Sequence, residues 1–157
     1  MKIELKAIKH FEAGSEETAC FTANVYVNGK MVGTAKNQGH GGMTFVHFQD
    51  RALEAQVVAY CAKMPPRHYE GLDLKMNLDF YIDLLLEEHL KAKDEKRLVK
   101  IDQKEKKRFL DHGYPICVRI TFHGTVVWVG LKKMSELDAA LAKSAAKHGS
   151  IKRHKLV

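Results

Sequence analysis

The sequence predicts an α+β fold, in which a mainly antiparallel sheet is built from two hairpins plus flanking strands and the helices pack on one side. The Asn28-Gly29 pair joins two strand-like segments, and this dipeptide is the strongest short-range signal for a two-residue hairpin turn. A second pair of alternating segments flanks His123-Gly124. Between the hairpins, apolar residues recur at helical spacing, which predicts helices that cover the sheet.

The first hairpin follows an alternating strand at residues 3–8 and a polar loop at residues 11–17. A two-residue turn would place Val27 opposite Lys30 and Val25 opposite Val32, because each turn length fixes one pairing register. The predicted core side consists of Phe21, Ala23, Val25, Val27 and Val32.

A glycine-rich loop, Asn-Gln-Gly-His-Gly-Gly at residues 37–42, leads into a further strand at residues 43–48. That strand presents His47 on one face. The spacing of the glycines matches neither a P-loop nor a dinucleotide-binding fingerprint, and the loop precedes a strand instead of a helix.

Two helices and a charged segment are predicted next. Asp50 is a candidate N-cap for a helix that ends before Pro65-Pro66, and residues 67–76 read as a loop. Asn77 or Asp79 is expected to cap a second helix. From residue 91 to residue 108 the chain is densely charged, which predicts a solvated helix that is broken or bent near Asp94.

In the second hairpin, the predicted register places Arg119 directly across from Trp128. Ser135-Glu136-Leu137-Asp138 resembles a capping box that opens a last helix ending at His148-Gly149. The residues from Ile151 onward are expected to form a mobile basic tail.

The length of 157 residues predicts one α+β domain covering residues 1–157. Two sub-lobes, 1–66 and 111–150, joined by a charged helical segment and followed by a basic tail at 150–157, are the alternative organisation. No apolar run approaches a membrane span and the first residues alternate, so we expect a cytoplasmic protein without a membrane partner. Cys20, Cys61 and Cys117 form no metal-binding or disulfide pattern, and no cofactor or metal is expected.

The charge distribution indicates the class of partner. The net charge is +7, and residues 91–157 carry 17 Lys/Arg against 7 Asp/Glu. A basic surface of this kind attracts phosphates or acidic protein surfaces, which makes a nucleic acid, a nucleotide or an acidic host protein the candidate partner. The oligomeric state is open.

Three groups of residues are candidate ligand contacts. Glycine amides can cradle an anion, and Arg119 and Trp128 can form a cation–π platform for a base with lysines nearby for phosphates. The first two groups comprise Lys36, Gly39, His40, Gly41, Gly42, Arg119, Trp128, Lys132 and Lys133. The third is the basic end of the last helix with the tail: Lys143, Lys147, Lys152, Arg153 and Lys155.

Catalysis is the weaker interpretation. His40, with His47 or His123, is a candidate acid–base pair for phosphodiester cleavage, since one group must remove a proton while the other donates one. No complete metal-hydrolase motif accompanies these histidines.

Residues 21–42 carry the pattern F-x-A-x-V-Y-V-N-G-K-x-V-G-T-A-x-N-x-G-H-G-G. This pattern resembles the N-terminal half of small uncharacterised bacteriophage and prophage proteins. The resemblance implies a phage context, with a location in the host cytoplasm, and no catalytic residues. We therefore expect an accessory protein that acts by binding a phosphate-bearing ligand, and that counters host defence. The alternatives are an inhibitor that docks on a host protein through its basic C-terminal face, and a small His-dependent nuclease or phosphodiesterase.

Overall fold

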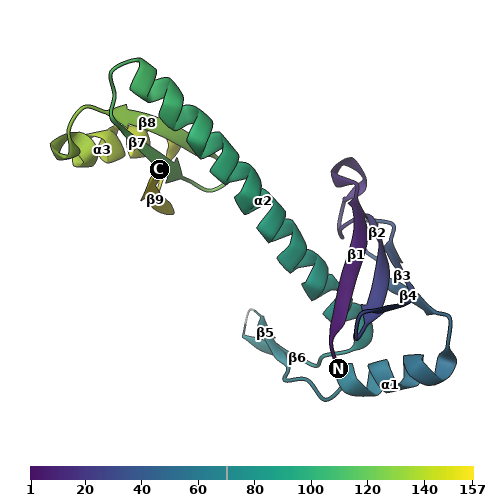
Figure 1. Cartoon of the computed structure of the whole chain (residues 1–157). Coiled ribbons are helices and arrows are strands. Elements are labelled where there is room, and N and C mark those ends of the chain that lie inside the picture. Colours follow the sequence, from purple (N-terminus) through teal and green to yellow (C-terminus); the bar gives the residue numbers. More distant parts are fainter. Residues whose placement is uncertain (70) are drawn as a thin grey trace. The chain divides into compact units, whose positions relative to one another are not determined.

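The computed structural model (Figure 1) describes residues 1–69 and 71–157. The fold is α+β, as predicted, with antiparallel sheets and three α-helices in these ranges. The chain divides into two compact units, residues 1–91 and 92–157, and the boundary falls inside helix α2 (Leu78–Asp111). The two predicted hairpins lie in different sheets, one in each unit.

Unit 1, residues 1–91, contains a four-stranded antiparallel sheet in the order β1-β2-β3-β4. The predicted Asn28-Gly29 turn is confirmed, with φ angles of 49° and 83° at these two residues. The strands are β1 (Ile3–His10), β2 (Phe21–Val27), β3 (Lys30–Asn37) and β4 (Phe45–Phe48).

The predicted register of the first hairpin is correct only next to the turn. Val27 pairs with Lys30, but a β-bulge then shifts the pairing so that Val25 lies opposite Gly33 instead of Val32. The bulge lets Val32 and Ala35 both reach the core, because an extra residue in one strand reverses its alternation.

The core of unit 1 lies on one face of this sheet. All five predicted core residues are buried. They pack against Val57 and Cys61 of helix α1 (Arg51–Cys61) and against Ile82 and Leu86 of α2. The predicted N-cap of α1 is confirmed, since the Asp50 carboxylate accepts a hydrogen bond of 2.8 Å from the amide of Ala52.

Two predictions between the hairpins are corrected. The segment predicted as a loop, residues 67–76, contains two short paired strands, β5 (Arg67–Tyr69) and β6 (Leu72–Leu74). Glu70 in this segment lies outside the described residues. Helix α2, capped by Asn77 through the amide of Phe80, continues to Asp111 without a break near Asp94. Its sequence holds no glycine or proline and is rich in strong helix formers, which explains its continuity.

Unit 2, residues 92–157, contains a three-stranded antiparallel sheet in the order β8-β7-β9. The predicted register of the second hairpin is confirmed at every pair, including Arg119 opposite Trp128. One sheet face packs on Leu137 and Leu141 of the last helix. These elements are β7 (Ile116–Thr121), β8 (Val126–Leu131), α3 (Leu137–His148) and β9 (Arg153–Leu156).

The C-terminal predictions need two corrections. The capping box does not form: a 3₁₀ turn, Met134–Glu136, places Ser135 before the start of α3, and the N-cap position, Glu136, makes no side-chain capping hydrogen bond. The tail is an ordered strand, not a mobile segment. Strand β9 pairs with the edge of β7, and Ile151 packs against the apolar cluster of unit 2.

Within the described ranges, no helix combines the length and the apolar character needed to cross a membrane.

Candidate functional site

The outward face of the sheet in unit 1 is the first candidate surface. Residues on this face point away from the core that α1 and α2 cover, and two cross-strand rows run from β1 to β4. The first row is Lys9, Thr22, Lys36 and Phe45. The second row is Lys6, Asn24, Thr34 and His47.

This open face combines basic and aromatic side chains. Lys6, Lys9 and Lys36 are exposed, and none of them forms an ion pair with any other residue that the structure describes. The ammonium group of Lys6 lies 4.4 Å from the centroid of the Tyr26 ring. Phe45 is 60% exposed, although phenylalanine is usually buried. The face therefore offers both cations and an exposed ring.

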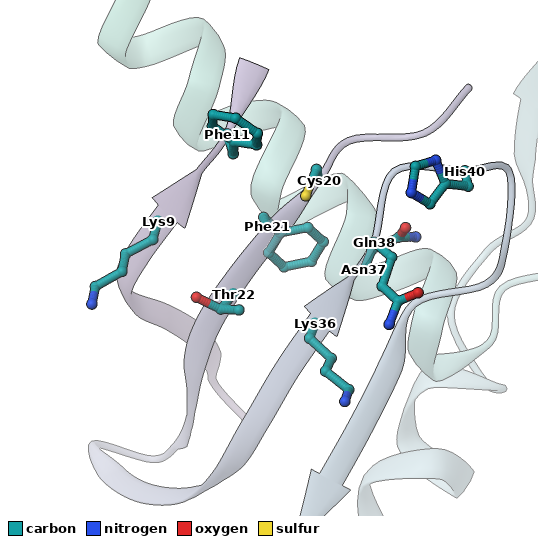
Figure 2. Close-up of a pocket in the computed structure, with 9 residues that line it drawn as sticks. All are labelled: Lys9, Phe11, Cys20, Phe21, Thr22, Lys36, Asn37, Gln38 and His40. Atoms are coloured by element: carbon teal, nitrogen blue, oxygen red, sulfur yellow. The ribbon is translucent and has the colours of Figure 1, made fainter. Parts of the chain in front are cut away.

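A cavity of about 450 Å³ lies at one end of the same face. Figure 2 shows Lys9, Thr22 and Lys36 side by side on adjacent strands, with Phe11 and His40 beyond them at the strand ends. The volume falls within the range of small-ligand pockets. Cys20, Phe21, Asn37 and Gln38 complete the lining.

The glycine-rich loop is held by the chain itself. The carbonyl oxygen of Gly39 accepts hydrogen bonds from three successive amides, those of residues 16–18, at 3.0, 3.0 and 3.3 Å. Successive amides of this kind form an anion-binding concavity, and here a backbone carbonyl fills it. The amides of Gly39 and Gly41 donate to Asn37 and Thr18. Of the predicted loop contacts, Lys36 and His40 line the cavity, whereas Gly39, Gly41 and Gly42 do not.

Asn37 fixes this loop to the rest of unit 1. Its side chain accepts hydrogen bonds from Thr18 and Gly39, and donates to the Gly42 carbonyl and to Thr44. Thr44 in turn donates to Asp83 of α2. Burial raises the pKa of Asp83, against the opposing effect of the Thr44 hydrogen bond. The loop is therefore anchored at one side of the cavity.

In unit 2, Arg119 and Trp128 turn toward α2. Arg119 is only 2% exposed, and its Nη1 donates to Oδ2 of Asp102 at 2.9 Å. The indole Nε1 of Trp128 donates to Oδ1 of the same carboxylate at 2.7 Å. Lys132 and Lys133 are exposed at the end of β8. The arginine charge is thus neutralised inside unit 2, Trp128 is partly buried, and the two lysines of this predicted group are exposed.

The C-terminal part of α2 exposes a basic stripe. Spacings of four and three residues align its five cations on one helix face. The basic stripe consists of Lys93, Arg97, Lys100, Lys104 and Lys107.

The remaining predicted cations are also exposed. Lys143 and Lys147 lie on α3, and Lys152 precedes β9. Arg153 and Lys155 on β9 line a cavity of about 220 Å³ with Arg119.

The candidate catalytic histidines are placed as follows. His40 lies 3.1 Å from the Glu16 carboxylate, and His47 stands on the open face of β4 opposite Thr34. His123 is exposed at the β7–β8 turn in unit 2. Among the described residues, no three His, Cys, Asp or Glu side chains gather as a metal site would require.

The chain was compared with protein-family models, curated proteins and solved structures, and no match was found. Its function must therefore be inferred from the residues and their placement.

Sequence reasoning missed Lys6, Lys9, Phe11 and Phe45. Simple alternation along β1 would place Lys6 and Lys9 on opposite faces. A bulge between them, with Ala7 at φ 50°, brings both to the outward face. The exposed aromatic residues carry no local sequence signal, because only tertiary packing decides which rings remain uncovered.

Proposed function

We propose that this protein binds single-stranded nucleic acid, a phosphate-bearing ligand, through the open face of unit 1 and acts without catalysing a reaction. The observation that carries the proposal is the row Lys9, Thr22, Lys36 and Phe45 across the four strands. Single-stranded ligands are bound by such a combination, since lysines meet the phosphates and an aromatic ring stacks on a base whatever its sequence.

Three features support this function. The apolar face of the sheet is already covered by α1 and α2, so the opposite face is available to a ligand. The three lysines on that face are not neutralised by ion pairs within the described ranges. The cavity shares Lys9, Thr22 and Lys36 with the open face, so a nucleic-acid strand bound on the sheet would continue into the cavity.

The test is fluorescence anisotropy with labelled 12-nucleotide DNA and RNA strands, titrated with salt from about 50 mM. We expect the logarithm of the binding constant to fall linearly with the logarithm of salt concentration. Lys36→Ala should reduce that slope by about 0.7. Phe45→Ala should weaken binding about 5- to 100-fold at an unchanged slope. Lys63→Ala, an exposed lysine just after α1, is the matched control and should change affinity least.

Absence of binding to every strand at about 50 mM salt would refute the proposal. Identical effects of Lys36→Ala and Lys63→Ala would likewise remove the open face as the binding surface. The same mixtures also reveal any cleavage of the nucleic-acid strands. Cleavage that is lost in both His40→Ala and His47→Ala would show nuclease activity and overturn the proposal of binding without catalysis.

A second candidate function is inhibition of an acidic host protein, and the basic stripe of α2 favours it. The five cations project from one face of a continuous helix. Such a stripe suits an acidic surface by charge complementarity. The triple variant Lys100→Glu, Lys104→Glu, Lys107→Glu should then lose a partner that wild type captures from nuclease-treated host lysate, while strand binding by unit 1 persists.

The resemblance of residues 21–42 to small phage proteins extends the proposal to the biological setting. A phage accessory protein that sequesters nucleic acid or a nucleotide signal would counter a host defence system in the host cytoplasm. In a host that carries the defence system, the wild-type protein should restore infection by a phage. Loss of this effect in the double variant Lys36→Ala, Phe45→Ala would support this setting.

A further inference from the structure

Phe11 at the mouth of the cavity is held in place although it is exposed. The side chain is 61% exposed. Its backbone amide donates to the Cys20 carbonyl at 2.9 Å, and its carbonyl accepts from the Ser15 hydroxyl at 3.0 Å. Ser15 also accepts the Cys20 amide at 2.8 Å, so the two chain segments that flank the cavity are tied together.

The ring itself rests on a glycine. A Cβ atom placed on Gly14 would lie 2.6 Å from Cδ1 and 3.0 Å from Cε1 of Phe11, closer than side chains tolerate. Gly14 therefore lets the ring settle against the backbone. A ring supported in this way loses little freedom when a planar group stacks on it, and such preorganisation favours binding.

The groups around the ring complement a nucleotide. Lys9 and Lys36 stand at the rim on either side of Thr22 (Figure 2). Gln38 is exposed in the lining and, among the residues described, has no side-chain hydrogen bond, so its amide can both donate and accept. The amide of Asn37, by contrast, is fully engaged by the loop.

We propose that this cavity is a nucleotide subsite, in which one base stacks on Phe11 and its phosphates lie against Lys9 and Lys36. The inference rests on the proposed binding of single strands and adds a defined position for one nucleotide, either free or within a strand. Phe11 stacks the base, the two lysines bind the phosphate, and Gln38 hydrogen-bonds the base edge.

Cys20 provides a native reporter for occupancy of this cavity. It is partly exposed and belongs to the lining, whereas Cys61 and Cys117 are buried. Burial also raises the pKa of the Cys61 and Cys117 thiols, which lowers their thiolate fractions and their reactivity. Alkylation by a maleimide should therefore occur at Cys20 first.

The experiment measures the rate of Cys20 alkylation by mass spectrometry in the full-length protein, alone, with AMP, and with a 12-nucleotide adenine strand. We expect at least one of these ligands to slow the reaction about 5-fold or more at saturation. Protection by AMP would identify a free nucleotide as sufficient, and protection by the strand alone would place the nucleotide within a chain.

Variants separate stacking from other effects. Phe11→Ala should lower the affinity for the ligand that protects Cys20 by about 5- to 100-fold, and Phe11→Trp should retain the wild-type affinity. Because the ring is largely exposed, we expect both variants to fold, as thermal unfolding will check. Phe45 does not line the cavity, so Phe45→Ala should weaken binding of the nucleic-acid strand and leave protection by AMP unchanged.

Strand binding with unchanged Cys20 reactivity, or with equal affinity in Phe11→Ala, would overturn the subsite and leave the proposed function standing. Failure of every strand to bind would overturn the proposed function instead.

Discussion

Arg119 and Trp128 lie opposite each other across β7 and β8, yet both donate hydrogen bonds to one carboxylate, that of Asp102 on α2. Asp102 is 6% exposed, and its carboxylate uses one oxygen for each partner. This three-residue cluster satisfies a buried charge and fixes one sheet face of unit 2 against the helix.

Asp102→Asn should destabilise unit 2 by about 3–5 kcal/mol, because it removes the buried counter-charge of the Arg119 guanidinium and leaves only an ion pair with an exposed carboxylate. Urea unfolding followed by the fluorescence of Trp128, the single tryptophan, measures this loss. Glu95→Gln is the control. Glu95 lies 3.6 Å from Arg119 but is 49% exposed, so its loss should cost at most about 1 kcal/mol. Equal effects of the two substitutions would contradict the assignment.

Gly39→Ala should destabilise unit 1 by more than about 2 kcal/mol. Gly39 has a φ of 90°, and an added Cβ would collide with the carbonyl oxygen of Gly14. Gly42→Ala in the same loop meets nothing within 4 Å and should change stability by less than about 0.5 kcal/mol. Thermal unfolding compares the two, and a tolerated Gly39→Ala would show that the loop is not packed in this way.

Asp83 should make the stability of unit 1 fall with rising pH. Since burial raises its pKa in the folded state, the folded protein binds the proton more tightly than the unfolded chain. The stabilisation is complete below the unfolded pKa of about 4 and is lost as pH rises through the folded value. Asp83→Asn removes this dependence and retains an acceptor for Thr44.

The free-energy difference between Asp83→Asn and wild type should therefore grow in favour of the variant from about pH 4 upward. Urea unfolding across pH gives this difference. Glu88→Gln on the exposed side of the same helix controls for the lost charge. A difference that is constant with pH would refute the linkage.

Deletion of residues 151–157 should cost unit 2 more than about 2 kcal/mol. The deletion removes β9 from the edge of β7 and takes Ile151 out of the apolar cluster. Lys155→Thr keeps the strand and should leave stability within about 0.5 kcal/mol of wild type. Hydrogen exchange at the β7 amides provides a second readout, and unchanged protection after the deletion would indicate a mobile tail.

The sequence by itself determined the features that depend on neighbouring residues. The turn at His123-Gly124 and the alternation around it gave every pair of the second hairpin, because a two-residue loop permits one register. Asp50 and Asn77 were identifiable as caps, since their side chains reach amides only two or three residues away.

Only the tertiary structure decided the relationships between distant segments. Asp102 could not be paired with Arg119 and Trp128 from sequence, because nothing local indicates which turn of a charged helix will face a sheet. The bulges that expose Lys9 and bury Val32 arise from how neighbouring strands fit, and the tail became a strand because β7 offered an edge. Local geometry sets turns and caps, whereas the packing of the whole unit selects which side chains are covered and which remain available to a ligand.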